Sequence, residues 1–168
     1  SEHMCRARGH NLPALVVADE RTWAVAGKAV DAGLRSAGVV ACDPLVFPAE
    51  PCLYASLDNA HTIADRLRTL DAETGSAVVP IAVGSGTIND LTKLAAKDVG
   101  RRYAVVGTAA SMDGYTGAGA PISDNGGKVT MQCVAPQVVI FDLDITAAAP
   151  QVMTASGYGD LAAKIPGG

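Results

Sequence analysis

The sequence predicts an α/β fold: a Rossmann-like, doubly wound parallel sheet with helices on both faces and a small β-hairpin insertion. Short runs of Val, Ile and Ala alternate with segments whose apolar residues recur at helical spacing. Strands without polar alternation are typical of a parallel sheet buried on both faces. The length of 168 residues, 49% of them hydrophobic and 18% charged, suits one globular domain.

The N-terminal half predicts strand and helix in alternation. The first strand is Ala14–Ala18, and the apolar face of the next helix carries Trp23, Ala26, Val30 and Leu34. A later segment repeats the pattern, with either Ser56 or Asp58 as its cap. The elements expected in order are the strand Ala14–Ala18, the helix Thr22–Ala37, a weaker strand at Val39–Ala41 and Leu45–Phe47, and the helix Ser56–Leu70.

The second half continues the alternation and then interrupts it. Pro80 within the third strand indicates an edge or a bulge, because proline cannot donate a ladder hydrogen bond. The segment Asp124–Gly127 reads DNGG, a strong hairpin turn. The elements expected here are the strand Ala77–Val83, the helix Ile88–Val99, the strand Tyr103–Gly107, a hairpin of Ala120–Ser123 with Lys128–Cys133, and the strand Val138–Phe141.

Composition excludes several classes of protein. The net charge is −4, aromatic residues make up 4%, and no basic run occurs, so nucleic acid is not an expected partner. No signal peptide or apolar stretch of membrane-spanning length is found, so we expect a cytoplasmic protein without membrane insertion. The spacing of the four cysteines favours reduced thiols over disulfides or a zinc site: Cys5, Cys42, Cys52, Cys133.

A glycine-rich turn joins the third strand to the following helix. In Gly84-Ser85-Gly86-Thr87 the glycines let backbone approach a ligand closely, and the helix begins with unpaired N–H groups. This favours an anion such as the pyrophosphate of a dinucleotide. The usual fingerprint is incomplete, because Asn89 replaces its third glycine and the turn follows the third strand rather than the first. A plain strand-to-helix turn with Thr87 as N-cap is the alternative.

Two later segments carry single carboxylates among small residues. Thr108–Pro121 follows the fourth strand and contains Asp113, at the edge of the sheet where ligands bind in open α/β folds. Ser156–Asp160 lies in the last helical pattern, where each glycine costs roughly 1 kcal/mol against alanine. Those glycines indicate close approach of a ligand or metal to Asp160, or else a helix-packing contact beside a solvated carboxylate.

Together these segments resemble the sn-glycerol-1-phosphate dehydrogenase family, within the wider group of iron-dependent alcohol dehydrogenases, glycerol dehydrogenase and dehydroquinate synthase. The matching stretches cover about half of the chain in family order: LVVADERT, VGSGTINDLTKLAA, GTAASMDGYTGAGAPI and VVIFDLDITAAAPQVMTASGYGDLAAKI. The resemblance implies an oxidoreductase that interconverts dihydroxyacetone phosphate and glycerol 1-phosphate with NAD or NADP.

The resemblance also implies roles for individual residues. Asp113 and Asp160 match the family's catalytic and substrate-binding positions, and Asp160 also matches a metal ligand that works with two histidines. Zinc would suit such a site, and iron or nickel could replace it. The positions that match the nucleotide-binding segments are Gly84, Ser85, Gly86, Thr87, Ile88, Asn89, Asp90, Thr108, Ala109, Ala110, Ser111 and Thr116.

One cofactor contact is predicted from position alone. Asp19 ends the first strand, where its carboxylate could accept the ribose 2′-OH and repel a 2′-phosphate, so we expect a preference for NAD. Its alternative role is to cap the Thr22 helix. Gly117 departs from the family pattern, which has serine after D-G-Y-T, so a hydroxyl that the resemblance implies near the nicotinamide is missing.

The histidines and lysines leave the metal and phosphate sites incomplete. His10 and His61 stand at the wrong places for metal ligands, and Lys128 and Lys164 are expected to be solvated. We therefore expect residues 1–4 to be a tag scar, 5–146 an NAD-binding domain, and 147–168 the first helix of a truncated metal-binding domain. This chain would be inactive alone, and its uncovered helix would favour self-association into a homo-oligomer. The alternatives are a dehydroquinate-synthase-like lyase and a stand-alone nucleotide-binding module.

Overall fold

The computed structural model describes residues 12–124 and 127–165 and is organised by a parallel sheet. Five strands lie in the order β2-β1-β3-β4-β7, and every neighbouring pair is parallel. This confirms the predicted fold class. Ser1–Met4, Cys5 and His10 lie outside the described residues. The strands are β1 (Ala14–Asp19), β2 (Leu45–Phe47), β3 (Val79–Gly84), β4 (Ala104–Gly107) and β7 (Val138–Phe141).

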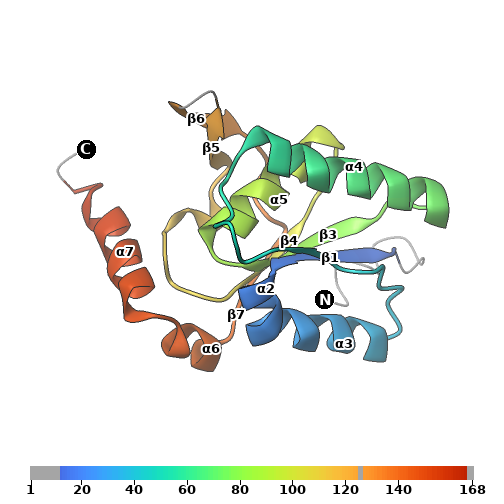
Figure 1. Cartoon of the computed structure of the whole chain (residues 1–168), viewed down its shortest axis with the longest axis horizontal. Helices are drawn as coiled ribbons and strands as arrows, with labels where there is room; N and C mark the ends of the chain where they lie inside the picture. The colour runs from blue at the N-terminus through green and yellow to red at the C-terminus, as the bar shows by residue number, and fades with distance from the viewer. Residues whose placement is uncertain (1–11, 125–126, 166–168) are drawn as a thin grey trace.

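Helices cover both faces of the sheet (Figure 1). On one face α2 (Glu20–Thr22), the π-helical turn η1 (Trp23–Gly27) and α3 (Lys28–Ser36) follow one another directly, as the single helix predicted there. On the other face α4 (Leu57–Thr74) packs against α5 (Gly86–Asp98). Ser56, not Asp58, caps α4, since its hydroxyl accepts the Asn59 N–H.

Alternate residues of β1 explain why the strands read as unbroken apolar runs. Leu15 and Val17 belong to the core under α4 and α5, whereas Val16 and Ala18 belong to the core under α3. All of them are buried. Successive side chains of a strand point to opposite faces, so a strand covered on both faces must be apolar at every position.

The prediction that Pro80 marks an edge or a bulge was wrong, since Pro80 pairs in continuous register with Leu15 of β1. β3 is the middle strand, between β1 and β4. Val79 donates its N–H to Pro13 on the β1 side, so the alternation of the backbone turns the Pro80 nitrogen toward β4. Pairing with β4 begins only at Ile81. Proline therefore lacks its N–H at a position just before the β3–β4 ladder begins, where no hydrogen bond to β4 would be made.

The predicted hairpin forms beyond the sheet. β5 (Gly119–Asp124) and β6 (Gly127–Gln132) pair antiparallel, with Asp124 opposite Gly127. The turn residues Asn125 and Gly126 lie outside the described residues. Ala120 and Ile122 of β5 are buried against the α4–α5 core, which fixes the hairpin on that layer. Lys128 on β6 is exposed, as expected.

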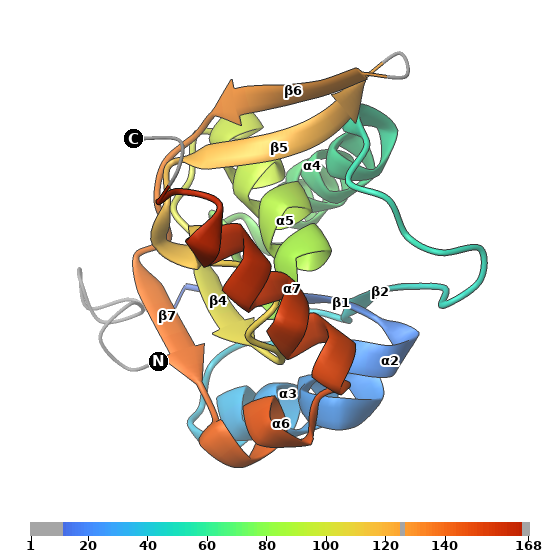
Figure 2. The ribbon, with the colours of Figure 1, turned by 90° about the vertical axis from the view of Figure 1, so that its left-hand side faces the viewer.

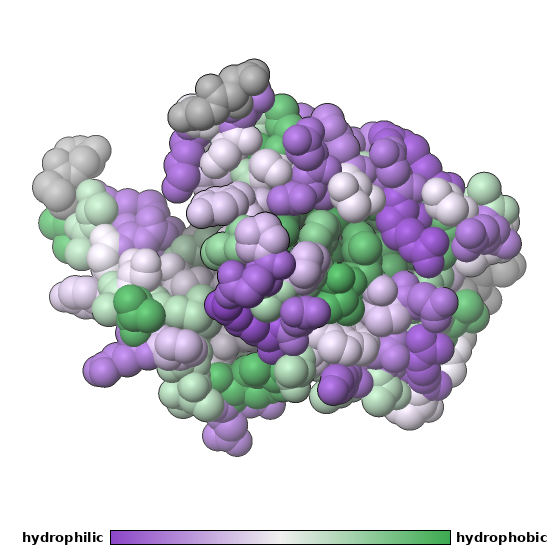
Figure 3. Space-filling model, viewed as in Figure 1, coloured by the Kyte–Doolittle hydropathy of each residue, from purple (hydrophilic) through white to green (hydrophobic). Residues whose placement is uncertain are grey.

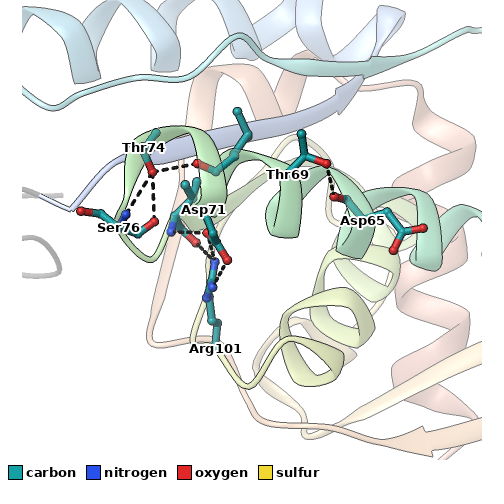
Figure 4. Close-up of polar contacts among 8 residues, drawn as sticks. Asp65, Thr69, Asp71, Thr74, Ser76 and Arg101 are labelled. Carbon is teal, nitrogen blue, oxygen red and sulfur yellow. Dashed lines mark hydrogen bonds and ion pairs between the residues drawn. The ribbon is translucent and has the colours of Figure 1, made fainter.

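A half-buried ion pair between Asp71 and Arg101 joins three segments at the end of the sheet where β3 and β4 begin (Figure 4). Asp71 of α4 accepts hydrogen bonds from the Val78 N–H at 3.0 Å and from the Arg101 guanidinium. Arg101 also donates to the Val78 carbonyl at 3.0 Å. Partial burial opposes ionisation of Asp71, but Arg101 and the Val78 N–H outweigh it and lower the pKa of the carboxyl. This junction lies away from the glycine turn.

The last helices form a separate ledge. They are α6 (Leu143–Ala148) and α7 (Gln151–Ala162), and Figure 2 shows α7 running between the hairpin and α6. The expected boundary at 146–147 falls inside α6. Figure 3 shows a mainly hydrophilic surface over α4, with apolar side chains reaching the surface around α6 and α7; the exposed ones are Leu143, Val152, Tyr158, Leu161 and Ile165. Among the described residues, no helix has the length and apolarity to cross a bilayer.

Candidate functional site

A cleft of about 700 Å³ lies at the carboxyl ends of the strands. Its floor comes from the ends of β1 and β4 and from the glycine turn, and α6 and the start of α7 form a wall. The structure brings several of the predicted cofactor-binding residues to this cleft: Asp19, Ser85, Thr87, Thr108 and Ala109. Carboxyl ends of parallel strands are where open α/β folds bind ligands.

The glycine turn leads directly into the first turn of α5. Ser85 is the N-cap, with extended backbone and no side-chain capping bond, so Thr87 is not the cap that the alternative reading required. Thr108 donates its N–H to the Gly84 carbonyl at 3.1 Å and so joins the turn to the end of β4. A Cβ at Gly84 would lie 2.8 Å from the Cβ of Ile88. Close packing of strand and helix therefore requires glycine there.

Gly86 meets a different neighbour. A Cβ on Gly86 would lie 3.0 Å from the Met112 sulfur, the end of a flexible side chain, rather than against backbone. The Cβ direction therefore points toward Met112, which does not line the cleft, and the fold can accept a larger residue at position 86 when the Met112 side chain moves aside. The helix N-terminus and the close approach of backbone together suit an anion in this cleft.

Other residues expected to bind the cofactor lie beneath the turn. Ile88, Asn89 and Asp90 are buried and do not line the cleft. The Asn89 amide donates to Asp90 Oδ1 at 3.1 Å and accepts from the Tyr103 hydroxyl at 3.0 Å. Their side chains thus brace the start of α5 from inside. Ala110 and Thr116 are exposed, and Ser111 is half-buried, outside the cleft lining.

Sequence reasoning missed Lys93, which is 1% exposed. Its ammonium donates to the Gly119 carbonyl at 2.9 Å and the Gly114 carbonyl at 3.3 Å, and lies 3.5 Å from Asp90 Oδ1. A buried lysine needs such partners, because a charge removed from water is costly unless it is paired. The signal available in the sequence was a lone lysine, three residues after Asp90, inside the apolar run LTKLAA.

Tyr115 also anchors the loop between β4 and β5, whose carbonyls accept the hydrogen bonds from Lys93. It lies in the 3₁₀ turn η2 (Gly114–Thr116), and its hydroxyl donates to the Ala109 carbonyl at 2.7 Å. Its ring packs edge-on against Phe141, with centroids 4.9 Å apart. The segment between β4 and β5, which carries Asp113, is therefore bound both to α5 and to β7.

The two predicted catalytic carboxylates come together beside α7. Asp160 accepts the backbone N–H of Asp113 at 3.0 Å. The Lys164 ammonium lies 2.5 Å from Asp113 Oδ1 and 3.9 Å from Asp160 Oδ1. The expectation that Lys164 is merely solvated was wrong, because the α7 backbone carries it to the same side as Asp160, one turn later. Its hydrogen bond lowers the pKa of the Asp113 carboxyl.

These carboxylates do not form a metal centre within the described chain. No group of three or more His, Cys, Asp or Glu side chains gathers in residues 12–124 and 127–165. His61 is exposed on α4. A divalent metal with an open position needs about three protein ligands, and here an ammonium lies between two carboxylates. The donor set described here therefore does not fit the metal that the resemblance implies.

Asp90 makes stability depend on pH. Burial raises the pKa of its carboxyl from 3.8 to about 6, although Lys93 and Asn89 oppose the shift. Between these values the folded chain holds the proton more tightly than the unfolded chain, so this group's contribution to the free energy of unfolding falls as pH rises. We expect wild type to lose about 2 kcal/mol relative to Asp90→Asn between pH 4 and 6.

Urea denaturation of both proteins at several pH values measures that difference. Comparing the two cancels the contributions of carboxyls whose pKa is lowered, such as Asp71. A difference that is constant across this range would show that Asp90 titrates normally in the fold.

A glycine turn opening a helix at the carboxyl edge of a parallel sheet is the arrangement of dinucleotide-binding α/β proteins. Within that class, the chain belongs to the iron-containing alcohol dehydrogenase family, whose model matches residues 1–150. The expected family resemblance is thereby confirmed. The family is named for iron, and curated relatives of the chain carry NAD(P)+ in their names.

Curated relatives are named glycerol-1-phosphate dehydrogenase (NAD(P)+). The protein from Halalkalibacterium halodurans is 36% identical over 152 residues, covering 89% of this chain and 36% of the relative. That from Bacillus subtilis is 37% identical, covering 94% and 39%, and that from Methanosarcina barkeri is 36% identical, covering 94% and 41%. The chain thus spans well under half the length of these relatives.

Solved structures share the fold. Glycerol dehydrogenase from Schizosaccharomyces pombe superposes with a TM-score of 0.69 at 22% identity, covering 89% of this chain and 36% of that one. Maleylacetate reductase from Rhizobium sp. superposes with a TM-score of 0.66 at 20% identity, covering 85% and 38%. At these identities the likeness concerns architecture alone.

Proposed function

We propose that this chain is the nucleotide-binding part of a dehydrogenase that interconverts dihydroxyacetone phosphate and sn-glycerol 1-phosphate with NAD or NADP. The observation that carries the proposal is the uncapped N-terminus of α5 at the floor of the 700 Å³ cleft. The names of the relatives support the choice of this reaction. A cytoplasmic location and a small polyol phosphate as substrate belong to the same proposal.

Each part of the cleft has a proposed task. The backbone of Ser85, Gly86 and Thr87 binds the pyrophosphate, where N–H groups and the helix dipole favour negative charge. Asp19 accepts a ribose hydroxyl. Ile145 and Met153, which line the opposite wall, exclude water from the cofactor. The nicotinamide supplies hydride transfer, and the protein holds it in place.

Asp113 and Asp160 are proposed to orient the substrate hydroxyls. Zinc, or iron or nickel in its place, is proposed to need Asp160 together with ligands that the described residues do not provide. The chain alone is therefore proposed to bind nucleotide without catalysing the reaction. Mixed with dihydroxyacetone phosphate, NADH and Zn²⁺, it should leave the absorbance of NADH unchanged.

The binding experiment is a titration with NADH. Trp23, the only tryptophan, follows Thr22 at the cleft wall, so bound NADH should quench its emission by energy transfer. Gly86→Val should weaken binding at least tenfold, about 1.4 kcal/mol, because a β-branched side chain crowds the backbone that must approach the phosphate. Stability should change little, since the flexible end of Met112 can yield to the added Cβ. Gly33→Val is the matched control, since a Cβ there has no neighbour within 4 Å.

The rate of cysteine alkylation gives an independent measure of NADH binding in the cleft. Cys52 is exposed and lines the cleft, whereas burial raises the pKa of the half-buried Cys42 and Cys133 thiols. NADH should slow labelling of Cys52 selectively, as followed by mass spectrometry. Wild type that binds no NADH would overturn the proposed function, and equal affinity of Gly86→Val would remove the turn from the site.

A further inference from the structure

The rim of the cleft carries a guanidinium beside the carboxylate expected to meet the ribose. We propose that Arg21 binds the 2′-phosphate of NADPH, that Glu50 competes for the same guanidinium, and that this ion pair thereby sets the choice between NADH and NADPH. The inference rests on the proposed dinucleotide function and adds a residue that decides coenzyme specificity.

Strand register places this rim next to the pyrophosphate turn. β1 and β3 are paired with Val17 opposite Ala82, and extending that register by two residues puts Asp19 beside Gly84. Neighbouring strands lie about 4.8 Å apart. Asp19 and Arg21 both line the cleft. In dinucleotide-binding folds, the carboxylate near the ribose bonds the 2′-OH, and a nearby arginine accommodates a 2′-phosphate.

Asp19 is held in place by a reciprocal cap. Its Oδ1 accepts the Thr22 N–H at 2.8 Å, and the Thr22 hydroxyl accepts the Asp19 N–H at 3.1 Å. The capping role considered for Asp19 is therefore real. It fixes the carboxylate at the rim, where its negative charge disfavours a 2′-phosphate, as the predicted NAD preference requires.

Arg21 is the cation on this rim. Its guanidinium donates to Glu50 Oε1 at 2.8 Å, and the side chains are 69% and 79% exposed. Glu20 accepts the Ala49 N–H at 2.9 Å and so keeps the segment that carries Glu50 beside α2. Exposed ion pairs contribute little, so a phosphate dianion can displace Glu50. A guanidinium offers that phosphate two parallel hydrogen bonds.

The charges around Arg21 predict which coenzyme wild type prefers. Glu50 pairs with the Arg21 guanidinium, and Asp19 and Glu20 lie next to Arg21 in the chain. The described part of this rim therefore carries more negative than positive charge and repels a 2′-phosphate unless Arg21 is released. NADH, which lacks that phosphate, needs no exchange of partners. Arg21 and Glu50 therefore act on NADPH in opposite directions and leave NADH nearly untouched.

The test is a set of titrations with NADH and NADPH, followed by Trp23 quenching at low ionic strength. Arg21→Ala should weaken NADPH binding about tenfold and change NADH binding less than twofold. Glu50→Gln should strengthen NADPH binding severalfold without affecting NADH. Arg68→Ala is the matched control, because Arg68 is also exposed and paired, to Asp65 on α4, and does not line the cleft.

The outcomes separate this inference from the proposed function. Wild type that binds neither coenzyme overturns the proposed function itself. Wild type that binds NADH, while Arg21→Ala and Glu50→Gln leave the ratio of the two affinities unchanged, overturns the assignment of Arg21 alone. Equal losses for both coenzymes in Arg21→Ala would show that Arg21 only shapes the cleft.

Discussion

Replacing Lys93 with methionine is expected to lower the free energy of unfolding by about 3–5 kcal/mol, because removing one partner of a buried ion pair strands the other. Asp90 would lose its cation, and the carbonyls of Gly114 and Gly119 would lose their donor. Methionine keeps much of the side-chain volume, so the loss reports charge and hydrogen bonding. Urea denaturation measures it, with Lys97→Met as control, since Lys97 is exposed on the same helix.

A second readout distinguishes the loop from the whole domain. Amide exchange in residues 111–119 should accelerate more in Lys93→Met than exchange in β1 and β3. Adding Asp90→Asn should recover part of the lost stability, because no carboxylate then remains buried without its cation, although the two carbonyls stay unpaired. If Lys93→Met matches Lys97→Met in stability, the buried contacts contribute nothing and the role assigned to Lys93 is wrong.

Alanine at Gly157 is expected to undock α7. Its Cβ would lie 2.1 Å from the Ala110 carbonyl oxygen, a backbone atom that cannot move aside cheaply. The helix must then shift away from the loop, which breaks the bonds from Asp113 to Asp160 and Lys164. Exchange of α7 amides should rise by about tenfold or more, corresponding to at least 1.4 kcal/mol of lost docking energy.

Gly159→Ala is the matched variant. It lies two residues away on the same helix, where an added Cβ meets nothing within 4 Å. Alanine there should slow exchange in α7, since it favours the helix by roughly 1 kcal/mol over glycine. Opposite signs at the two positions would identify Gly157 as a packing contact, whereas equal slowing at both would show that α7 is not seated on Ala110.

The sheet and its helices followed from local pattern. Runs such as ALVVA are apolar on both sides because β1 separates two cores, and the spacing of Ala60, Ile63, Ala64 and Leu67 marks the buried face of α4. The prediction from Pro80 was wrong because a central strand can contain proline where pairing with the neighbouring strand has not yet begun. That is a property of the assembled sheet rather than of the segment.

The candidate site was predictable where its residues lie on one turn or strand end. Asp19, Ser85 and Thr87 reach the cleft for that reason. The contacts of Lys93 and Lys164 were not predictable, because they join positions 21 to 51 residues apart and depend on how α5 and α7 pack. The spacing of residues within one segment cannot predict a hydrogen-bond partner that comes from another element of the fold.

Helices α6 and α7 form one wall of the cleft. Ligand binding in the cleft is therefore thermodynamically linked to the docking of these helices on the rest of the domain. Met153 and Pro150 line the cleft, and α7 is joined to the loop by the Gly157 contact, the Asp113–Asp160 hydrogen bond and the Asp113–Lys164 pair. A ligand that contacts both the wall and the floor binds only molecules in which α7 is docked, so part of its binding free energy is used to hold α7 in that position. The affinity measured for such a ligand is its intrinsic affinity multiplied by the fraction of molecules already docked.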